Sequence, residues 1–535
     1  MQVAAKDGRT NPGFEDVDLG TGSSSFDHTQ NGPLGNTNPG NQTEPTEVSN
    51  SDDNSSNGAA VAGTAEKSPR GAVIVRLDRS ISLPHLVAIL FAVSGGLSIF
   101  ISPGPILQYS GSVGLSLIVW FSGGIVNLLS ALCYTELGIR FPEAGGSYSY
   151  VLQTFGSMAG FVTLWGYIIL LVCPAWALLA YVSAVYIVQP FFSGCALPLV
   201  GVRLLAGAIF LLCAVLNCIN VKYISKIQIW FSGAKATAIV LIIVGGIYEM
   251  ALGNTENFSQ PFEGSSTKPG EIALAMLSSY FAYGGWQVIV NMMEESKHPE
   301  RDLPRSVYIS FTLIITLYCL TNMAYFSILS HTEITSTDAV GVLFISRLYS
   351  PLTTVISVLV AISSAGSLVA VVMGHSRLLF AAGRVGHMPS FVGMVHQKYR
   401  TPSPSIIILS FLTLVMLFTG QALVLMEYIS LFSALMSVEL QIILLYLRWK
   451  RTNETPSFQV PVIIAVLLLL FHLAVLVLSV YQKPRQLGIA LAIIVSGIPV
   501  YWLAVSWKQK PTSFTNFIDT LTRIVRCTLD VKKTE

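Results

Sequence analysis

The feature that most constrains this chain is a pair of adjacent glycines within a membrane-length apolar segment. Residues 276–295 contain the stretch LSSYFAYGGWQVIVNMMEE, with Gly284 and Gly285 near its middle. A segment this apolar is expected to cross a bilayer as a helix, but paired glycines weaken a helix and free backbone groups that lipid cannot satisfy. Such a break is tolerated at membrane depth only where it lines a cavity.

An earlier apolar segment repeats this interruption. Residues 87–105, VAILFAVSGGLSIFISPGP, contain Ser94, Gly95 and Gly96, and Pro103 follows. Two glycine-interrupted spans at corresponding positions indicate a transporter binding site near the bilayer midplane. The alternative interpretation is that these glycines only let neighbouring helices pack closely.

Composition predicts that the chain is a membrane protein. Of its 535 residues, 52% are hydrophobic and 11% are charged, and the mean hydropathy is +0.62. These values predict an all-α polytopic membrane protein. There is no P-loop, GxGxxG motif or metal-spaced Cys or His cluster, so we expect no enzyme, no cofactor and no bound metal. The net charge of +2 gives no reason to expect a nucleic-acid partner.

Hydropathy predicts twelve transmembrane helices between two tails. Residues 1–70 are polar and predict a disordered N-terminal tail, residues 80–510 the twelve-helix domain, and residues 511–535 a C-terminal tail with an amphipathic helix over 513–533. The third and eighth spans are long enough to tilt or to extend beyond the bilayer. The predicted spans are 84–108, 114–138, 158–188, 199–219, 228–250, 270–293, 306–330, 350–380, 404–420, 423–447, 458–481 and 486–507.

Lys and Arg collect on alternate sides of these spans. The side shared with the N-terminus carries most of them, which predicts that both termini are cytosolic. On this side lie Arg140, Lys222, Lys226, Lys297, Arg301, Arg305, Arg377, Arg384, Lys398, Arg400, Arg448, Lys450 and Arg451, and on the other only Arg203, Lys268, Arg347, Lys483 and Arg485.

Four stretches together resemble one transporter family. They are FAYGGW (281–286) followed by Glu294 and Glu295, IFISP (99–103), YTELGIRFPEAGGSYSY (134–150), and FSGAKATAIVLII, which contains Lys235. As a set they resemble the light chains of heteromeric amino acid transporters, of the L-type and b(0,+)-type, in the amino acid, polyamine and organocation superfamily. The resemblance covers about residues 80–510. It implies the LeuT-type fold, with two inverted five-helix repeats, broken helices one and six, and two further helices.

The resemblance also implies where an amino acid binds. Free N–H groups and carbonyls at a helix break suit a carboxylate and an ammonium, respectively. The implied substrate-binding residues are Ser94, Gly95, Gly96, Leu97, Ser98, Phe281, Ala282, Gly284 and Trp286, with Phe281 as a gate over the substrate. Core packing is the alternative for Phe281. The chain has Gly96-Leu97-Ser98 where the family usually has Gly-Ser-Gly, which leaves the carboxylate geometry and the substrate open.

Lys235 lies within the fifth span, where an unpaired cation is costly and suggests a function. In the family a lysine at this place takes the position that Na⁺ occupies in sodium-coupled relatives. The resemblance therefore implies transport without sodium. The alternative is that Lys235 extends to the cytosolic end of the helix.

Two further residues are candidates for substrate selection. Glu439 lies nine residues before Arg448 and well inside the tenth span, so it either selects substrate, senses protons or is structural. Ser433 is the second candidate, although its direction is not determined by the sequence. We expect Glu136 and the pair Glu294 and Glu295 to bind loop cations or helix ends, and His375 and His472 to be structural.

Cys195 is the single cysteine of the predicted outside loops. It is either a free thiol or half of an intermolecular disulfide. In the resembling family a cysteine at this place bonds to a single-span glycoprotein heavy chain that carries the pair to the plasma membrane.

Taken together, the sequence predicts a sodium-independent exchanger of amino acids, and the uncharged pocket candidates favour neutral substrates. A proton-coupled symporter remains an alternative. A non-transporting amino acid sensor is a second alternative, because the Gly96-Leu97-Ser98 triplet is unusual.

Overall fold

The computed structural model of the protein describes residues 81–94, 98–141, 145–192, 198–219, 221–337, 339–450, 456–507 and 509–533. The predicted N-terminal tail, the three residues Gly95, Gly96 and Leu97, and Cys195 lie outside this set.

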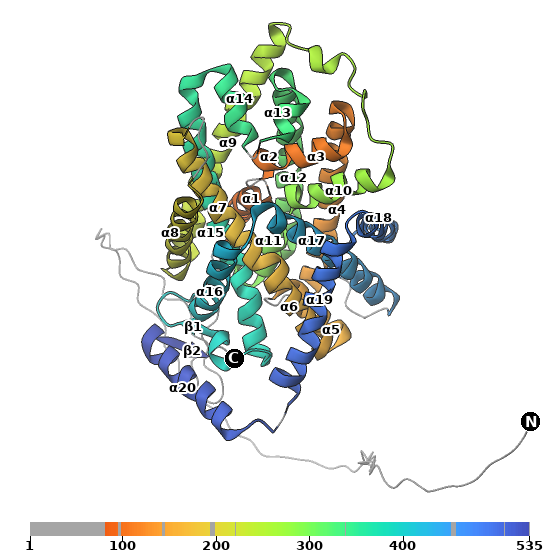
Figure 1. Cartoon of the computed structure of the whole chain (residues 1–535). Helices are drawn as coiled ribbons and strands as arrows, with labels where there is room; N and C mark the ends of the chain where they lie inside the picture. Colours follow the sequence, from red (N-terminus) through yellow and green to blue (C-terminus); the bar gives the residue numbers. More distant parts are fainter. Residues whose placement is uncertain are drawn as a thin grey trace, which may run out of the picture. The chain divides into compact units, whose positions relative to one another are not determined.

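The described residues are almost entirely helical, as the apolar runs predict (Figure 1). The first half contains α1 (Leu83–Ser94), α2 (Ser98–Ile101), α3 (Pro103–Ser110), α4 (Val113–Arg140), α5 (Gly146–Phe155), α6 (Ser157–Tyr167), the π-helical turn η1 (Ile168–Val172), α7 (Cys173–Val188), η2 (Gln189–Phe192), α8 (Leu199–Ile219) and α9 (Val221–Ala251). Then come η3 (Glu256–Phe258), α10 (Pro269–Tyr283), α11 (Gln287–Asn291), η4 (Met293–Glu295), α12 (Pro299–Ile328), α13 (His331–Thr335), α14 (Val340–Leu348), η5 (Ser350–Leu352) and α15 (Thr353–Val385). The last part contains η6 (Ser390–Gly393), β1 (Met394–His396), α16 (Ser403–Thr419), α17 (Ala422–Trp449), α18 (Val462–Gln482), α19 (Pro484–Tyr501), the π-helical turn η7 (Trp502–Ser506), α20 (Thr512–Leu529) and β2 (Val531–Lys533).

Ten helical segments within the described ranges are long and apolar enough to cross a membrane. They coincide with ten of the twelve predicted spans, and the third and eighth are both 36 residues long, as expected. The other two predicted spans are not among these ten. The span at 404–420 is the 17-residue α16, and the span at 270–293 is divided into α10 and α11 at the glycine pair. The chain is thus a polytopic helical membrane protein.

The outer surface of the bundle has the composition that lipid requires. On α18, which lies at the edge of the bundle in Figure 1, Ile463, Leu467 and Leu470 are 68%, 60% and 60% exposed. Apolar side chains in such numbers on an outer helix face are stable only against hydrocarbon.

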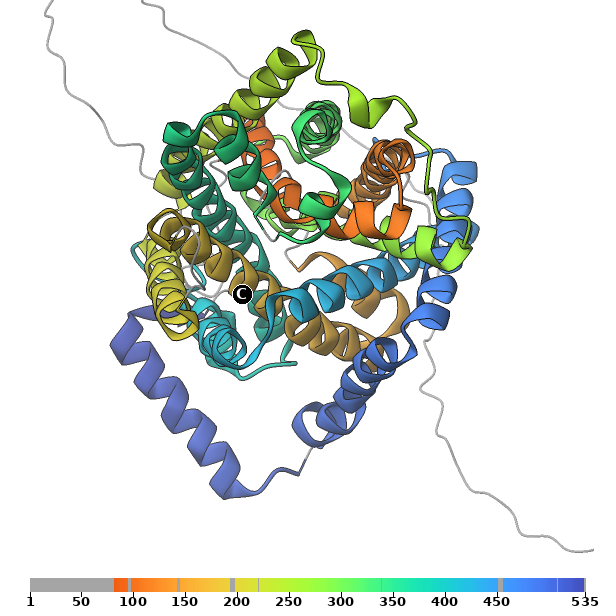
Figure 2. The ribbon, with the colours of Figure 1, turned by 45° about the horizontal axis from the view of Figure 1, so that its top comes forward.

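The two interrupted segments lie at the centre of the bundle (Figure 2). α1 contacts α9, α11, α12 and α15, and α10 contacts α3, α4, α17 and α18. Helices from both halves of the sequence therefore enclose the ends of α1 and α10.

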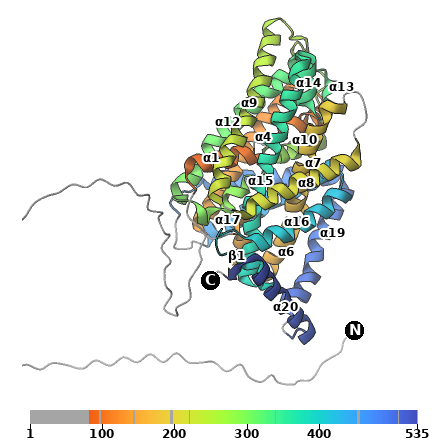
Figure 3. The same ribbon diagram turned by 90° about the vertical axis from the view of Figure 1, so that its left-hand side faces the viewer.

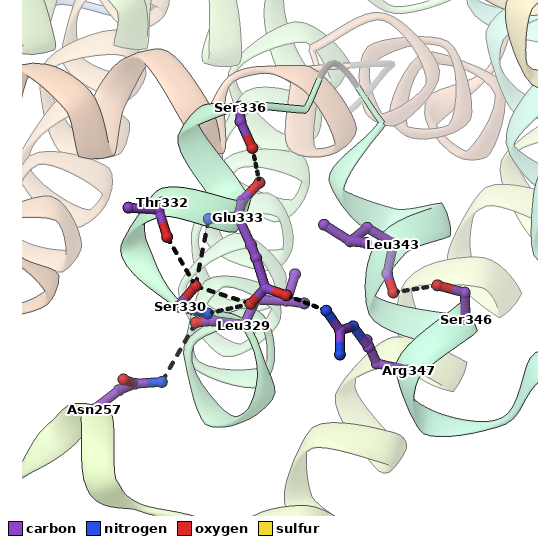
Figure 4. A network of polar contacts seen from close by, with 9 residues as sticks. All are labelled: Asn257, Leu329, Ser330, Thr332, Glu333, Ser336, Leu343, Ser346 and Arg347. Atoms are coloured by element: carbon purple, nitrogen blue, oxygen red, sulfur yellow. Dashed lines mark hydrogen bonds and ion pairs between the residues drawn. The ribbon is translucent and has the colours of Figure 1, made fainter. Parts of the chain in front are cut away.

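At one end of the bundle, hydrogen bonds and an ion pair connect the short helices η3, α13 and α14. Ser330 and Glu333 form a capping box at the start of α13, in which the Ser330 N–H donates to the Glu333 carboxylate at 3.0 Å. Glu333 also pairs with Arg347 of α14. Asn257 donates to the Leu329 carbonyl at 3.3 Å, so that η3 joins the same network (Figure 4).

The C-terminal tail lies at the opposite end, and it differs from the predicted helix in its last residues. α20 ends at Leu529, because Asp530 adopts a left-handed conformation with φ of 47°. The following residues pair as the antiparallel strand β2 with β1, with Val395 opposite Lys532. Figure 3 shows α20 beside β1 at this end of the bundle. The helix of the tail thus ends before residues 531–533, because strand pairing with a distant loop is not encoded in the tail itself.

Candidate functional site

The break between α10 and α11 is formed by Gly284 and Gly285. Gly285 has φ of +91°, a conformation that favours glycine. A Cβ on Gly285 would lie 2.3 Å from the Val93 side chain of α1. Glycine is therefore needed here both for the backbone turn and for the close approach of α1.

Ser98 joins the two interrupted segments. Its hydroxyl, at the start of α2, donates to the Ala282 carbonyl of α10 at 2.6 Å. It also lies 2.8 Å from the Tyr318 hydroxyl of α12, which donates to the Ser94 carbonyl at the end of α1 at 3.4 Å. The side chain that departs from the family pattern thus joins the start of α2 to α10 and α12.

A cavity of about 70 Å³ lies beside these breaks. Four of the sequence-predicted site residues line it: Ser98, Phe281, Gly284 and Ser433. Ser94, Ala282 and Trp286 are buried but are not among its lining residues. The other lining residues are Val93, Leu171, Ala175, Leu178, Leu179, Tyr280, Gly285, Gln287, Val371, His375 and Ile429.

Sequence reasoning missed the contributions of α7 and α15 to this cavity. His375 of α15 was expected to be structural, but it lines the cavity and is 2% exposed. The Trp176 indole of α7 donates to Nδ1 of His375 at 3.3 Å. Nε2 of His375 has no hydrogen-bond partner among the described residues. The available signal was a lone histidine in an apolar span, which does not reveal the direction of its side chain.

Trp286 does not line the cavity but packs beside the break between α10 and α11. Its indole donates to the Asn127 side chain of α4 at 3.3 Å, and its ring meets Tyr134 edge to face at 5.3 Å. The start of α11 is therefore held against α4.

Lys235 of α9 joins three helices. It is 1% exposed, and its ammonium donates to the Ala92 carbonyl at 2.5 Å and to the Phe91 carbonyl at 3.2 Å, both in the last turn of α1. It lies 3.3 Å from the Ser367 hydroxyl of α15. The side chain is thus directed toward the first break and does not extend along α9 to the helix end.

Glu439 lies on α17, away from the central cavity. Its carboxylate accepts a hydrogen bond from the Thr163 hydroxyl of α6 at 2.7 Å, and it is absent from the lining of the cavity. Glu439 is therefore not placed to contact a molecule in that cavity.

Two buried ion pairs connect helices near the end of the bundle where α20 lies. Glu295 and Arg377 are each 1% exposed and join η4 to α15 at 2.6 Å. Glu136 of α4 is fully buried, pairs with Arg448 of α17 and accepts from the Val460 N–H at 2.8 Å. These carboxylates bind cations and a loop N–H, as their positions in the sequence predict.

The arrangement defines a class of protein: a polytopic helical membrane protein in which the break between α10 and α11 lies beside α1 and α2 at a small cavity whose described lining has no Asp, Glu, Lys or Arg. The family model described as amino acid permease matches residues 81–505, and the chain belongs to this family.

Named relatives cover most of the chain. It is 34% identical to the human cystine/glutamate transporter over 466 residues, which are 87% of this chain and 93% of that protein. It is 36% identical to the large neutral amino acids transporter small subunit 2 of Mus musculus, over 87% of this chain and 88% of that protein. It is 35% identical to the Asc-type amino acid transporter 1 of Mus musculus, over 84% and 85%. By name these relatives are transporters, and none is an enzyme.

Proposed function

We propose that this protein is a sodium-independent exchanger of neutral amino acids that works by alternating access. The observation that carries the proposal is the cavity between the breaks, whose lining residues in the described chain include no Asp, Glu, Lys or Arg. An uncharged lining favours substrates whose side chains carry no charge, because an unpaired buried charge is costly. The names of the relatives support amino acids as the substrate class.

Binding of the zwitterion is assigned to the helix breaks. We propose that Ser94, Gly95, Gly96, Leu97 and Ser98 supply backbone groups to the substrate, and that Phe281 covers it as a gate. Carbonyls at the end of α10 are the matching acceptors for the ammonium. Ala282 and Trp286 support this wall from outside the cavity.

Independence from sodium is assigned to Lys235. Its ammonium already satisfies the Ala92 carbonyl and lies beside the Ser367 hydroxyl. Oxygen atoms of this kind are the ligands that a sodium ion requires, and a fixed ammonium there leaves no need for the ion.

The same proposal covers the architecture and the partner. The interrupted segments correspond to predicted spans one and six, which supports a LeuT-type fold of twelve helices in two inverted five-helix repeats. We assign both termini, with a disordered N-terminal tail over residues 1–70, to the cytosol, and the protein to the plasma membrane.

We also propose that Cys195 forms a disulfide with a single-span glycoprotein heavy chain.

Exchange is tested with purified protein, with and without such a heavy chain, in sodium-free proteoliposomes. Internal neutral amino acid should accelerate uptake of labelled leucine. Equal uptake into loaded and empty vesicles would contradict exchange. Strong accumulation in empty vesicles under a pH gradient would instead support a proton-coupled symporter, and binding without transport would support a sensor.

A further inference from the structure

A second and larger cavity lies next to the central one, along α10 and α17. It encloses about 150 Å³ and is lined by residues of α3, α10, α17, α18 and the start of α19. It shares no lining residue with the central cavity. We call it the peripheral cavity.

An ion pair lies at the peripheral cavity. Lys483, between α18 and α19, pairs with Glu427 of α17, and their side chains are 27% and 36% exposed. The Lys483 ammonium also lies 5.5 Å from the centre of the Tyr109 ring. These groups match the two charges of a zwitterion. The cation can bind an anionic group, and the carboxylate and the face of the aromatic ring can both attract an ammonium.

The remaining wall contains apolar side chains, four polar residues (Gln108, Ser278, Ser430 and Gln486) and the hydroxyl of Ser479. Leu274, Leu277 and Met426 provide hydrocarbon next to the charged pair. Ser479, one turn before Lys483, is 3% exposed, and its hydroxyl has no hydrogen-bond partner in the described part of the chain. A buried donor without a partner is costly, so a polar atom of a ligand would satisfy it.

Two helices line both cavities in successive turns. On α10, Leu277 lines the peripheral cavity and Phe281 the central one, and on α17, Ser430 and Ser433 are divided in the same way. A molecule that separates or tightens α10 and α17 in the peripheral cavity therefore acts on the wall of the central cavity.

We propose that the peripheral cavity binds a zwitterion that carries an apolar chain. Its anionic group binds Lys483, its ammonium binds Glu427 and the Tyr109 ring, and its chain lies on Leu274 and Leu277. Two sources supply this chemistry: a free large neutral amino acid, or a zwitterionic phospholipid from the bilayer. The site is independent of the exchange proposed for the central cavity.

Both sources are tested on the full-length protein purified in mild detergent. Saturation binding of tritium-labelled leucine counts amino acid sites, and native mass spectrometry counts retained phosphatidylethanolamine and phosphatidylcholine. Leu277→Trp fills the cavity without changing the ion pair, and Lys483→Gln removes the cation. Arg485→Gln is the matched control, because Arg485 is an exposed cation two residues away that does not line the cavity.

If the amino acid is the ligand, Leu277→Trp binds one leucine molecule fewer per chain than the wild type. If phospholipid is the ligand, the wild type retains one zwitterionic lipid that Leu277→Trp loses. Lys483→Gln should weaken the affected binding about tenfold, since it removes a charge-assisted hydrogen bond. A wild type that holds neither ligand, or ligand binding that survives Leu277→Trp, overturns the proposal. A transport failure with this binding intact would instead count against exchange alone.

Discussion

The Lys235 ammonium donates a 2.5 Å hydrogen bond to the carbonyl oxygen of Ala92, in the last turn of α1. The same oxygen accepts from the Ser367 hydroxyl of α15 at 2.6 Å. One oxygen beside the first break therefore receives donors from α9 and α15, and the position of α1 depends on both helices.

Replacing Lys235 with Met should stop exchange while the protein still reaches the membrane. Methionine has similar length but leaves two buried carbonyls of α1 without this donor, and charge-assisted hydrogen bonds are worth roughly 1.5–3 kcal/mol each. Uptake in sodium-free proteoliposomes should fall at least about tenfold. Lys226→Met, at an exposed position of the same helix, is the control. Wild-type uptake by Lys235→Met would show that the ammonium is dispensable.

Ser98→Ala should raise the KM for substrate severalfold with little loss of expression. The change removes the hydroxyl that holds the Ala282 carbonyl and contacts Tyr318, which is worth about 1 kcal/mol. Ser102→Ala is a matched control, because the buried Ser102 hydroxyl has no hydrogen-bond partner in the described residues. An equal KM for the wild type and Ser98→Ala would argue that the link between the breaks does not shape the site.

Phe281→Ala should weaken or abolish exchange, because Phe281 forms part of the cavity wall and its ring is only partly buried. Uptake of labelled leucine and surface biotinylation measure the two effects separately. Phe411→Ala removes a 68% exposed ring from α16 and should leave uptake unchanged. Unchanged kinetics in Phe281→Ala would remove the gate assignment.

Cys195→Ser should abolish a high-mass band on a non-reducing gel while part of the transport survives. The expected band contains the heavy chain and collapses with reductant, and noncovalent contacts keep some of the pair together. Cys527→Ser, at an exposed cysteine of α20, should leave the band intact. A wild-type protein that runs as a monomer in native cells and reaches the surface alone would contradict the disulfide-linked partner.

Acidification below about pH 6.5 should destabilise the contact around His387, which follows α15. Burial lowers the pKa of His387, and its ring nitrogens lie 2.8 Å from the Tyr148 hydroxyl and 2.7 Å from the Ser157 hydroxyl. An unfolded histidine gains its proton near pH 6.5, but the folded one gains it only at lower pH. The folded state therefore binds fewer protons in this window, and stability falls as the pH falls through it.

Thermal melting of the purified protein at pH 7.5 and pH 5.5 measures this dependence. His387→Gln should reduce the difference between the two melting temperatures. His331→Gln, at an exposed histidine, should retain the wild-type difference. A wild-type difference in His387→Gln would mean that other groups carry the pH dependence.

The sequence by itself determined the membrane class, the approximate limits of the spans and the break at Gly284 and Gly285. These properties are local, because bilayer thickness sets the length of an apolar run and paired glycines weaken a helix wherever they occur. The unusual length of the spans Ser157–Phe192 and Ser350–Val385 was also predictable from the apolar runs.

Only the tertiary structure decided which side chains share the cavity. His375 and Trp176 are far apart in the sequence and meet because α15 packs against α7. Ser98 departs from the family motif, and its hydrogen bond to the Ala282 carbonyl, 184 residues away, depends on the packing of α2 against α10. The periodicity of an apolar span does not mark one face as buried when lipid and protein are equally apolar, so helix rotation, and with it the direction of Glu439 or Ser433, depends on packing between helices.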